Sequence, residues 1–144
     1  MAGLDFEAGM PGGLTAAGEL KVSTAHEDLQ LIMRTARAHP ACPEDFDVSW
    51  GHRNARQQQY MVDNGWSSLK FPKSLHNKIP SLAVDVVIRH NGEVTWEWER
   101  YERLSAHILR VFFTLKLTGK VAAKRLVWGG KWRSRDGTHY ELRF

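Results

Sequence analysis

The chain has 144 residues, which is the length of one ordinary domain. Its composition, 42% hydrophobic and 25% charged, is typical of a soluble globular protein. It contains no apolar run of about 18 residues, as a transmembrane helix requires, and its first residues lack the basic start and apolar stretch of a secretory signal. The single cysteine, Cys42, excludes an internal disulfide and every multi-cysteine metal motif. Any zinc site must therefore be built from histidines and carboxylates.

The formal net charge is +4. Basic residues are enriched in the last third of the chain, where apolar residues interrupt them: Lys116, Lys120, Lys124, Arg125, Lys131, Arg133 and Arg135. Two interpretations stay open. They form an ordinary solvated surface, or they attract an anionic partner such as a wall polymer, lipid headgroups or nucleic acid.

Residues 1–20 hold five glycines and one proline without hydrophobic periodicity, which indicates a flexible or loosely docked lead-in. Thr24 and Glu27 fit a capping box, and the apolar residues that follow recur at helical spacing. We therefore expect a helix of about 15 residues that ends at Pro40. Apolar residues alternate with polar ones over 46–50, which predicts a short strand.

A second helix is predicted to begin after Asn54, which can cap it, and to end at Asn64-Gly65. Residues 65–81 are polar and contain two prolines, so we expect a loop. Residues 82–88 form a compact run of β-forming side chains, which predicts a buried strand.

Asn91-Gly92 predicts a hairpin turn into a strand over 94–98. An apolar stripe over 101–117 predicts the longest helix. Two last strands are expected at 126–128 and 139–142. No repeat or internal boundary is evident, so residues 21–144 are expected to form a single domain of the α+β class. Its small antiparallel sheet would carry flanking helices.

His76 lies in the loop that leads into the strand carrying Asp85. An imidazole and a carboxylate that converge at such a point are ligands that zinc accepts. Asp85 also interrupts an apolar run, where an ionised carboxylate is costly unless it is paired or bound to a metal. The alternative is an aspartate on the solvated face of an edge strand.

His139 follows Asp136 across a turn and precedes Glu141 on the same strand face. This spacing can place the Asp136 carboxylate beside a metal that His139 binds, where a general base takes a proton from water. Glu141 can orient the imidazole ring. The alternative is a turn aspartate followed by an exposed strand. Two histidines, one aspartate and an open position are the pattern of a catalytic rather than a structural zinc site.

Four segments resemble, in order, the family of D-Ala-D-Ala carboxypeptidases, VanX-type dipeptidases and phage L-alanyl-D-glutamate endopeptidases, over residues 24–144. The segments are Gly51-His-Arg53 with Gln58, Ser74-x-His76 with Ala83-x-Asp85, Trp128-Gly-Gly-Lys-Trp132, and Asp136-x-x-His139-Tyr-Glu-Leu142. The third is similar to the phage endopeptidase branch in particular. The implied fold is the one shared by hedgehog domains and D-Ala-D-Ala peptidases.

The resemblance implies one cofactor, Zn²⁺, held by His76, Asp85 and His139. It implies that Asp136 is the catalytic base and that Arg53 donates to the scissile carbonyl as it becomes an oxyanion. It also implies that Ser74 and Gln58 line the substrate cleft.

This chain departs from the family pattern at two places. The stretch between the first histidine and the aspartate is two residues longer and contains Pro80. The loop can absorb them because only its ends must meet the metal. Lys131 stands where an acidic residue is common. The flanking Trp128 and Trp132 either wall the cleft or pack in the core.

We therefore expect a zinc metallopeptidase that hydrolyses a peptide bond in peptidoglycan. L-Ala–D-Glu is the favoured bond. We expect a monomeric phage endolysin that accumulates in the host cytoplasm and reaches the wall after the membrane is breached, with peptidoglycan and no nucleic acid as partner. Two alternatives stay open: a D-Ala-D-Ala dipeptidase or carboxypeptidase, and a non-catalytic, zinc-containing wall-binding module.

Overall fold

The computed structural model describes residues 12–144 of the chain. The elements follow in the order α1 (Ala16–Val22), α2 (Glu27–Ala38), β1 (Asp45–Trp50), α3 (Ala55–Asp63), β2 (Ala83–His90), β3 (Glu93–Thr95), α4 (Trp98–Leu117), β4 (Arg125–Trp128) and β5 (His139–Arg143). Two short 3-10 helices cover Leu75–Asn77 and Gly129–Lys131. The predicted α+β class with a small antiparallel sheet is confirmed.

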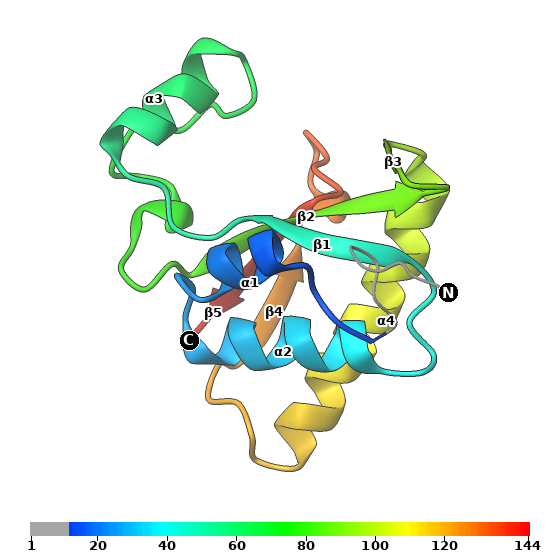
Figure 1. The fold of residues 1–144 in the computed structure, drawn as a ribbon. Coiled ribbons are helices and arrows are strands. Elements are labelled where there is room, and N and C mark those ends of the chain that lie inside the picture. The colour runs from blue at the N-terminus through cyan, green and yellow to red at the C-terminus, as the bar shows by residue number, and fades with distance from the viewer. Residues whose placement is uncertain (1–11) are drawn as a thin grey trace.

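The strands form one antiparallel sheet in the order β1-β2-β5-β4. β3 pairs with the last three residues of β2 through the turn at Asn91 and Gly92, whose φ values are 53° and 81°. Such positive values suit the predicted hairpin turn. β5, the last strand in sequence, lies between β2 and β4 (Figure 1).

Helices α2 and α4 supply much of the core, and Figure 1 shows both on the same side of the sheet. Their predicted apolar stripes are buried: Leu29, Ile32, Met33 and Ala36 in α2, and Leu104, Ile108, Val111, Phe112 and Leu115 in α4. Burying one such side chain contributes about 1.5–3 kcal/mol, so these stripes fix the helices to the sheet.

The prediction of a flexible lead-in over residues 1–20 is wrong for its last part, because helix α1 begins at Ala16. Thr15 caps the helix by accepting a hydrogen bond from Gly18 N at 3.0 Å. Thr15 also donates to the buried Asp47 carboxylate through its backbone N–H, at 3.3 Å, and through its hydroxyl. The segment is ordered because β1 supplies these partners, which a local glycine count does not reveal. The first part of the lead-in, residues 1–11, lies outside the described residues.

Two predicted boundaries also differ. Helix α2 begins at Glu27 behind a His26 cap, because the Thr24 hydroxyl donates to Lys21 O instead of capping. The strand predicted over 94–98 ends at Thr95, and Trp98 opens α4. Trp98 stacks on Trp128 with ring centroids 5.6 Å apart, so tertiary packing draws it into the helix.

Helix α3 follows its sequence closely. Asn54 and Gln57 form a capping box at its start, and Gly65 adopts a φ of 72° after its end. Figure 1 shows α3 and the loop after it extending away from the sheet. The helix therefore meets the rest of the molecule mainly through the segments that enter and leave it.

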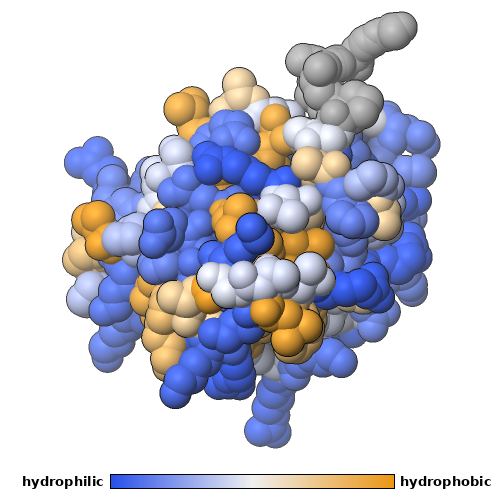
Figure 2. Space-filling model, turned by 90° about the horizontal axis from the view of Figure 1, so that it is seen from below, coloured by the Kyte–Doolittle hydropathy of each residue, from blue (hydrophilic) through white to orange (hydrophobic). Residues whose placement is uncertain are grey.

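The surface is mixed in character. Figure 2 shows apolar residues in small groups separated by hydrophilic ones on the face viewed from below. Within residues 12–144, none of the helices combines the length and the apolar character needed to cross a membrane.

Candidate metal centre

The sheet register brings two of the predicted ligands together. Asp85 of β2 lies directly opposite His139 of β5, and opposite Trp50 of β1 on its other side. The register between β1 and β2 shifts after Val48, just before this point. Directly opposed cross-strand side chains lie about 4.5–5.5 Å apart at Cβ, so this pairing places an imidazole beside a carboxylate.

His76 reaches the same point from the 3-10 helix Leu75–Asn77. Its Nδ1 lies 2.7 Å from the carbonyl oxygen of Gly51, at the end of β1. A side chain at position 51 would not fit, because its Cβ would lie 2.3 Å from Lys21 O. The lengthened loop between His76 and Asp85 therefore still delivers both residues to one place, as predicted.

Ligand atoms of His76, Asp85 and His139 lie within 4.8 Å of one another, and all three residues are buried. His76 Nε2 and His139 Nδ1 lie 3.4 and 3.3 Å from the same carboxylate oxygen, Asp85 Oδ1. The two imidazole rings meet edge to face with centroids 5.3 Å apart. The structure therefore gathers the three predicted ligands into one group.

The hydrogen bonds around this group leave room for a cation. His76 Nδ1 faces a carbonyl oxygen, which only accepts, so Nδ1 carries a proton and Nε2 is the nitrogen that faces Asp85. That Nε2 atom is buried without a hydrogen-bond partner among the described residues. A buried lone pair that faces a carboxylate oxygen is unfavourable unless a proton or a metal ion lies between them. The donor set of two imidazoles and one carboxylate suits zinc.

The close contacts between Asp85 and the two histidines shift the pKa values of Asp85 and His139. Burial raises the pKa of Asp85, but the neighbouring His76 and His139 outweigh burial and hold the pKa well below its usual range. Burial lowers the pKa of His139, but hydrogen bonds to Asp85 and Glu141 raise it to about 9. Asp85 is therefore ionised, as a metal ligand must be.

Glu141 holds the other side of the His139 ring. Its Oε1 lies 2.8 Å from His139 Nε2, and its Oε2 accepts from Arg143 Nε at 2.6 Å. Contact with a carboxylate orients an imidazole ligand and raises its basicity. Trp132 covers the ring with centroids 5.0 Å apart and is 39% exposed. Of the two alternatives for this tryptophan, the structure favours a wall beside the metal cluster.

Arg53 is buried, and its Nη2 donates to Asp85 Oδ2 at 2.6 Å. Burial lowers its pKa, while the charges of Asp85 and Asp136 oppose that change. Its Nε has no hydrogen-bond partner among the described residues. Arg53 therefore orients the carboxylate of a predicted ligand, Asp85.

Gln58 and Ser74, which are predicted to line the substrate cleft, are both buried and make hydrogen bonds around the cluster. Gln58 is fully buried, and its Oε1 accepts from Arg53 at 3.4 Å. Ser74 caps the 3-10 helix by accepting from His76 N at 3.2 Å. Asn77 joins them by donating to Arg53 O and to Gln58 Oε1, at 3.1 and 3.3 Å. The sequence interpretation missed Asn77, although its place three residues after Ser74 fits a capping pair.

Asp136 lies in the turn before β5 and is partly exposed. Its Oδ1 accepts from Thr138 N and Thr138 Oγ1, at 3.2 and 2.8 Å. Its backbone oxygen accepts from His139 N at 3.4 Å. The turn therefore fixes one carboxylate oxygen of Asp136 close to His139, a predicted metal ligand.

Trp128 belongs to the core. Its Nε1 donates to Gly137 O at 2.8 Å, and its ring stacks on Trp98. A Cβ at Gly130 would lie 2.2 Å from this ring. The Trp-Gly-Gly segment thus needs a glycine because the backbone passes directly over the tryptophan.

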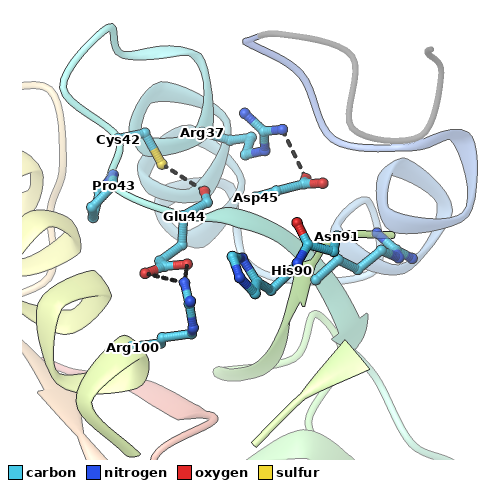
Figure 3. Close-up of a pocket in the computed structure, with 9 residues that line it drawn as sticks. Arg37, Cys42, Pro43, Glu44, Asp45, His90, Asn91 and Arg100 are labelled. Atoms are coloured by element: carbon cyan, nitrogen blue, oxygen red, sulfur yellow. Dashed lines mark hydrogen bonds and ion pairs between the residues drawn. The ribbon is translucent and has the colours of Figure 1, made fainter. Parts of the chain in front are cut away.

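A separate hollow beside the α2–β1 connection carries no comparable set of ligands. Figure 3 shows that its charged side chains pair with one another: Arg37 with Asp45 at 2.9 Å, and Arg100 with Glu44 at 3.0 Å. Cys42 donates to Glu44 O, and burial raises the pKa of its thiol. The ion pairs that line this hollow therefore have a structural role.

Comparison with known proteins agrees with this geometry. Residues 10–143 match the family described as phage L-alanyl-D-glutamate peptidase. Among solved structures, the chain is similar to the L-Ala D-Glu endopeptidase ChiX of Serratia marcescens, with 31% sequence identity and a TM-score of 0.69, over 91% of this chain and 90% of that chain. No curated protein gives a significant match. Because the family match spans almost the whole sequence, this chain belongs to the phage L-alanyl-D-glutamate peptidase family.

Proposed function

We propose that this protein hydrolyses the L-Ala–D-Glu bond of peptidoglycan stem peptides with a zinc ion held by His76, Asp85 and His139. The observation that carries the proposal is the buried Nε2 of His76, which has no hydrogen-bond partner among residues 12–144 and faces the Asp85 carboxylate shared with His139. Membership of the peptidase family supports the bond. The nitrogen and oxygen donors support zinc.

Bound at this cluster, zinc would polarise the scissile carbonyl and lower the pKa of water. Asp136 takes a proton from the attacking water and later delivers it to the leaving amine of D-Glu. Arg53 keeps Asp85 in place, and its positive charge stabilises the negative charge that develops on the carbonyl oxygen. Glu141 fixes the His139 ring.

In its biological setting we expect the protein to act as an endolysin, degrading the wall from within the host after the membrane is breached. Family membership supports this role. A D-Ala-D-Ala peptidase would use the same ligands but release a terminal D-Ala. A non-catalytic wall-binding module would have no use for a carboxylate placed as that of Asp136 is.

The test is digestion of purified peptidoglycan by the wild type and by Asp136→Asn, with mass analysis of the new termini. The wild type should release fragments with a new L-Ala carboxyl end and a new D-Glu amino end. Asp136→Asn should lose at least about a hundredfold in kcat, as expected for loss of a general base. It should keep its zinc content, and the exposed Asp63→Asn serves as the control.

Two results would contradict the proposal. Release of free D-Ala from intact muropeptides would assign the other bond. Wild-type rates in Asp136→Asn would remove this residue from the chemistry. Zinc content measured on the same samples separates loss of the base from loss of the metal.

A further inference from the structure

An exposed apolar surface lies on α3 and the loop that follows it. Its four large apolar side chains, of which Tyr60 and Trp66 touch each other, are called the aromatic rim: Tyr60, Trp66, Leu69 and Phe71. Their exposed fractions are 56%, 62%, 47% and 46%. Tyr60 and Trp66 meet edge to face with ring centroids 5.8 Å apart. Grouped, exposed aromatic side chains of this kind mark a binding surface more often than isolated ones do.

The aromatic rim is fixed to the metal centre by hydrogen bonds. Gln58 Nε2 donates to Leu69 O at 2.6 Å and to Ser67 Oγ at 3.0 Å. The Oε1 atom of the same amide accepts from Arg53, which in turn contacts Asp85. The buried Gln58 thus joins the rim loop to the group that holds a metal ligand. The loop that carries Trp66, Leu69 and Phe71 is therefore linked by hydrogen bonds to the residues around the cluster.

The segment between Asp63 and Asp85 carries only positive charges. No acidic residue occurs between Asp63 and Asp85, while Lys70, Lys73 and Lys78 lie in the same stretch and are exposed. The surface therefore combines flat aromatic faces with positive charge. A polymer of sugars whose attached peptides carry carboxylates would complement both features.

The proposed substrate has this chemistry close to the bond that is cut. In peptidoglycan, L-Ala is joined to the lactyl group of the muramic acid sugar, so about two residue lengths, roughly 7 Å, separate the scissile carbonyl from the glycan. A sugar ring presents an apolar C–H face that packs against aromatic side chains. We infer that the aromatic rim holds the glycan strand beside the metal centre. The inference rests on the proposed function and extends it to the sugar.

The test compares two substrates that differ only in the sugar: a muropeptide with its disaccharide, and the same stem peptide without it. Trp66→Ala combined with Phe71→Ala should lower kcat/KM on the muropeptide by about tenfold, mostly through KM, since two aromatic contacts are lost. On the sugar-free peptide the variant should match the wild type. Both side chains are exposed, so the fold should tolerate the change, which a thermal melt checks.

The matched control is Trp96→Ala combined with Phe113→Ala. These side chains are 68% and 62% exposed and lie before and within α4. The control should match the wild type on both substrates. Equal losses of the rim variant on both substrates would overturn the inference, because they would assign the rim a structural role. An unchanged KM on the muropeptide would also overturn it.

A direct binding measurement separates this inference from the proposed function. Titration of the peptide-free disaccharide should shift the indole NMR signal of Trp66 in the wild type, and Phe71→Ala should weaken that binding. If the wild type cleaves neither substrate but binds the disaccharide through Trp66, the proposed chemistry fails and the sugar site stands. If it cleaves the muropeptide and the disaccharide leaves the Trp66 signal unchanged, the sugar site fails alone.

Discussion

Each side chain of the metal cluster has a further contact that fixes its orientation. His76 is held by Gly51 O, His139 by Glu141, and Asp85 by Arg53. Such contacts fix the tautomer and the ring position before a metal binds. The cluster is therefore preorganised by its neighbours, and each neighbour is a point at which metal affinity can be changed without removal of a ligand.

Glu141→Gln tests this arrangement. The amide keeps the size of the side chain but loses the charge that makes the His139 imidazole more basic, so zinc affinity should fall by about 10–100-fold. Competition with a chromophoric chelator measures it. Glu93→Gln, an exposed glutamate on β3, should leave the affinity unchanged. Equal affinities for Glu141→Gln and the wild type would refute the orienting role.

Sequence motifs predict which single residues belong to this centre, but they do not predict contacts that depend on how the elements pack. That His76, Asp85 and His139 lie together was expected from the family resemblance, since each motif alone left a solvated or exposed position open; the structure brings the three together. The endopeptidase branch, predicted from the motifs, is confirmed by the family match. The burial of Gln58 and Ser74 was not predictable, because it depends on how α3 and the 3-10 helix pack against Arg53.

Among the secondary-structure elements, those with local signals agree with their predictions. The hairpin at Asn91-Gly92, the capping box of α3 and the apolar stripe of α4 all require only neighbours in sequence. Helix α1 was missed because its partner, Asp47, lies 32 residues away from Thr15. Long-range partners override local composition wherever a short helix docks on a strand.

The 3-10 helix Gly129–Lys131 yields a prediction about stability. Gly130→Ala should destabilise the protein by about 1–3 kcal/mol, because the new methyl group meets the ring of Trp128, which its stacking and hydrogen bond hold in place. Urea unfolding measures the difference. Gly13→Ala, which meets nothing within 4 Å, is the control and should be neutral or slightly stabilising. Equal unfolding midpoints for the two variants would argue against a rigid Trp128.

At the scale of the whole molecule, charge is strongly divided along the chain. Residues 103–135 contain nine of the twenty lysines and arginines and none of the sixteen acidic residues. The remaining residues hold eleven basic and sixteen acidic side chains. The segment runs through α4 and β4 and ends in the turn before β5. One part of the molecule is therefore strongly cationic although the net charge is small.

This division predicts salt-dependent attachment to anionic walls. Binding to isolated walls, measured by sedimentation, should weaken as salt rises, because exposed charges are screened within about 10 Å at 0.1 M ionic strength. Lys120→Glu with Lys124→Glu should reduce binding at low salt and flatten the salt dependence. Arg34→Glu with Arg56→Glu, an equal change in net charge outside the segment, should do less. If binding to the walls did not change with salt concentration, the basic residues would be an ordinary solvated surface.

The position of β5 has a consequence for synthesis. It is the last strand of this sheet to be synthesised, yet it inserts between β2 and β4 and carries His139 into register with Asp85. A nascent chain that has completed α4 but not β5 thus has an unfinished sheet and only two of the three side chains of the cluster. Formation of the cluster is therefore tied to completion of the sheet, because the strand that inserts last also supplies the third side chain.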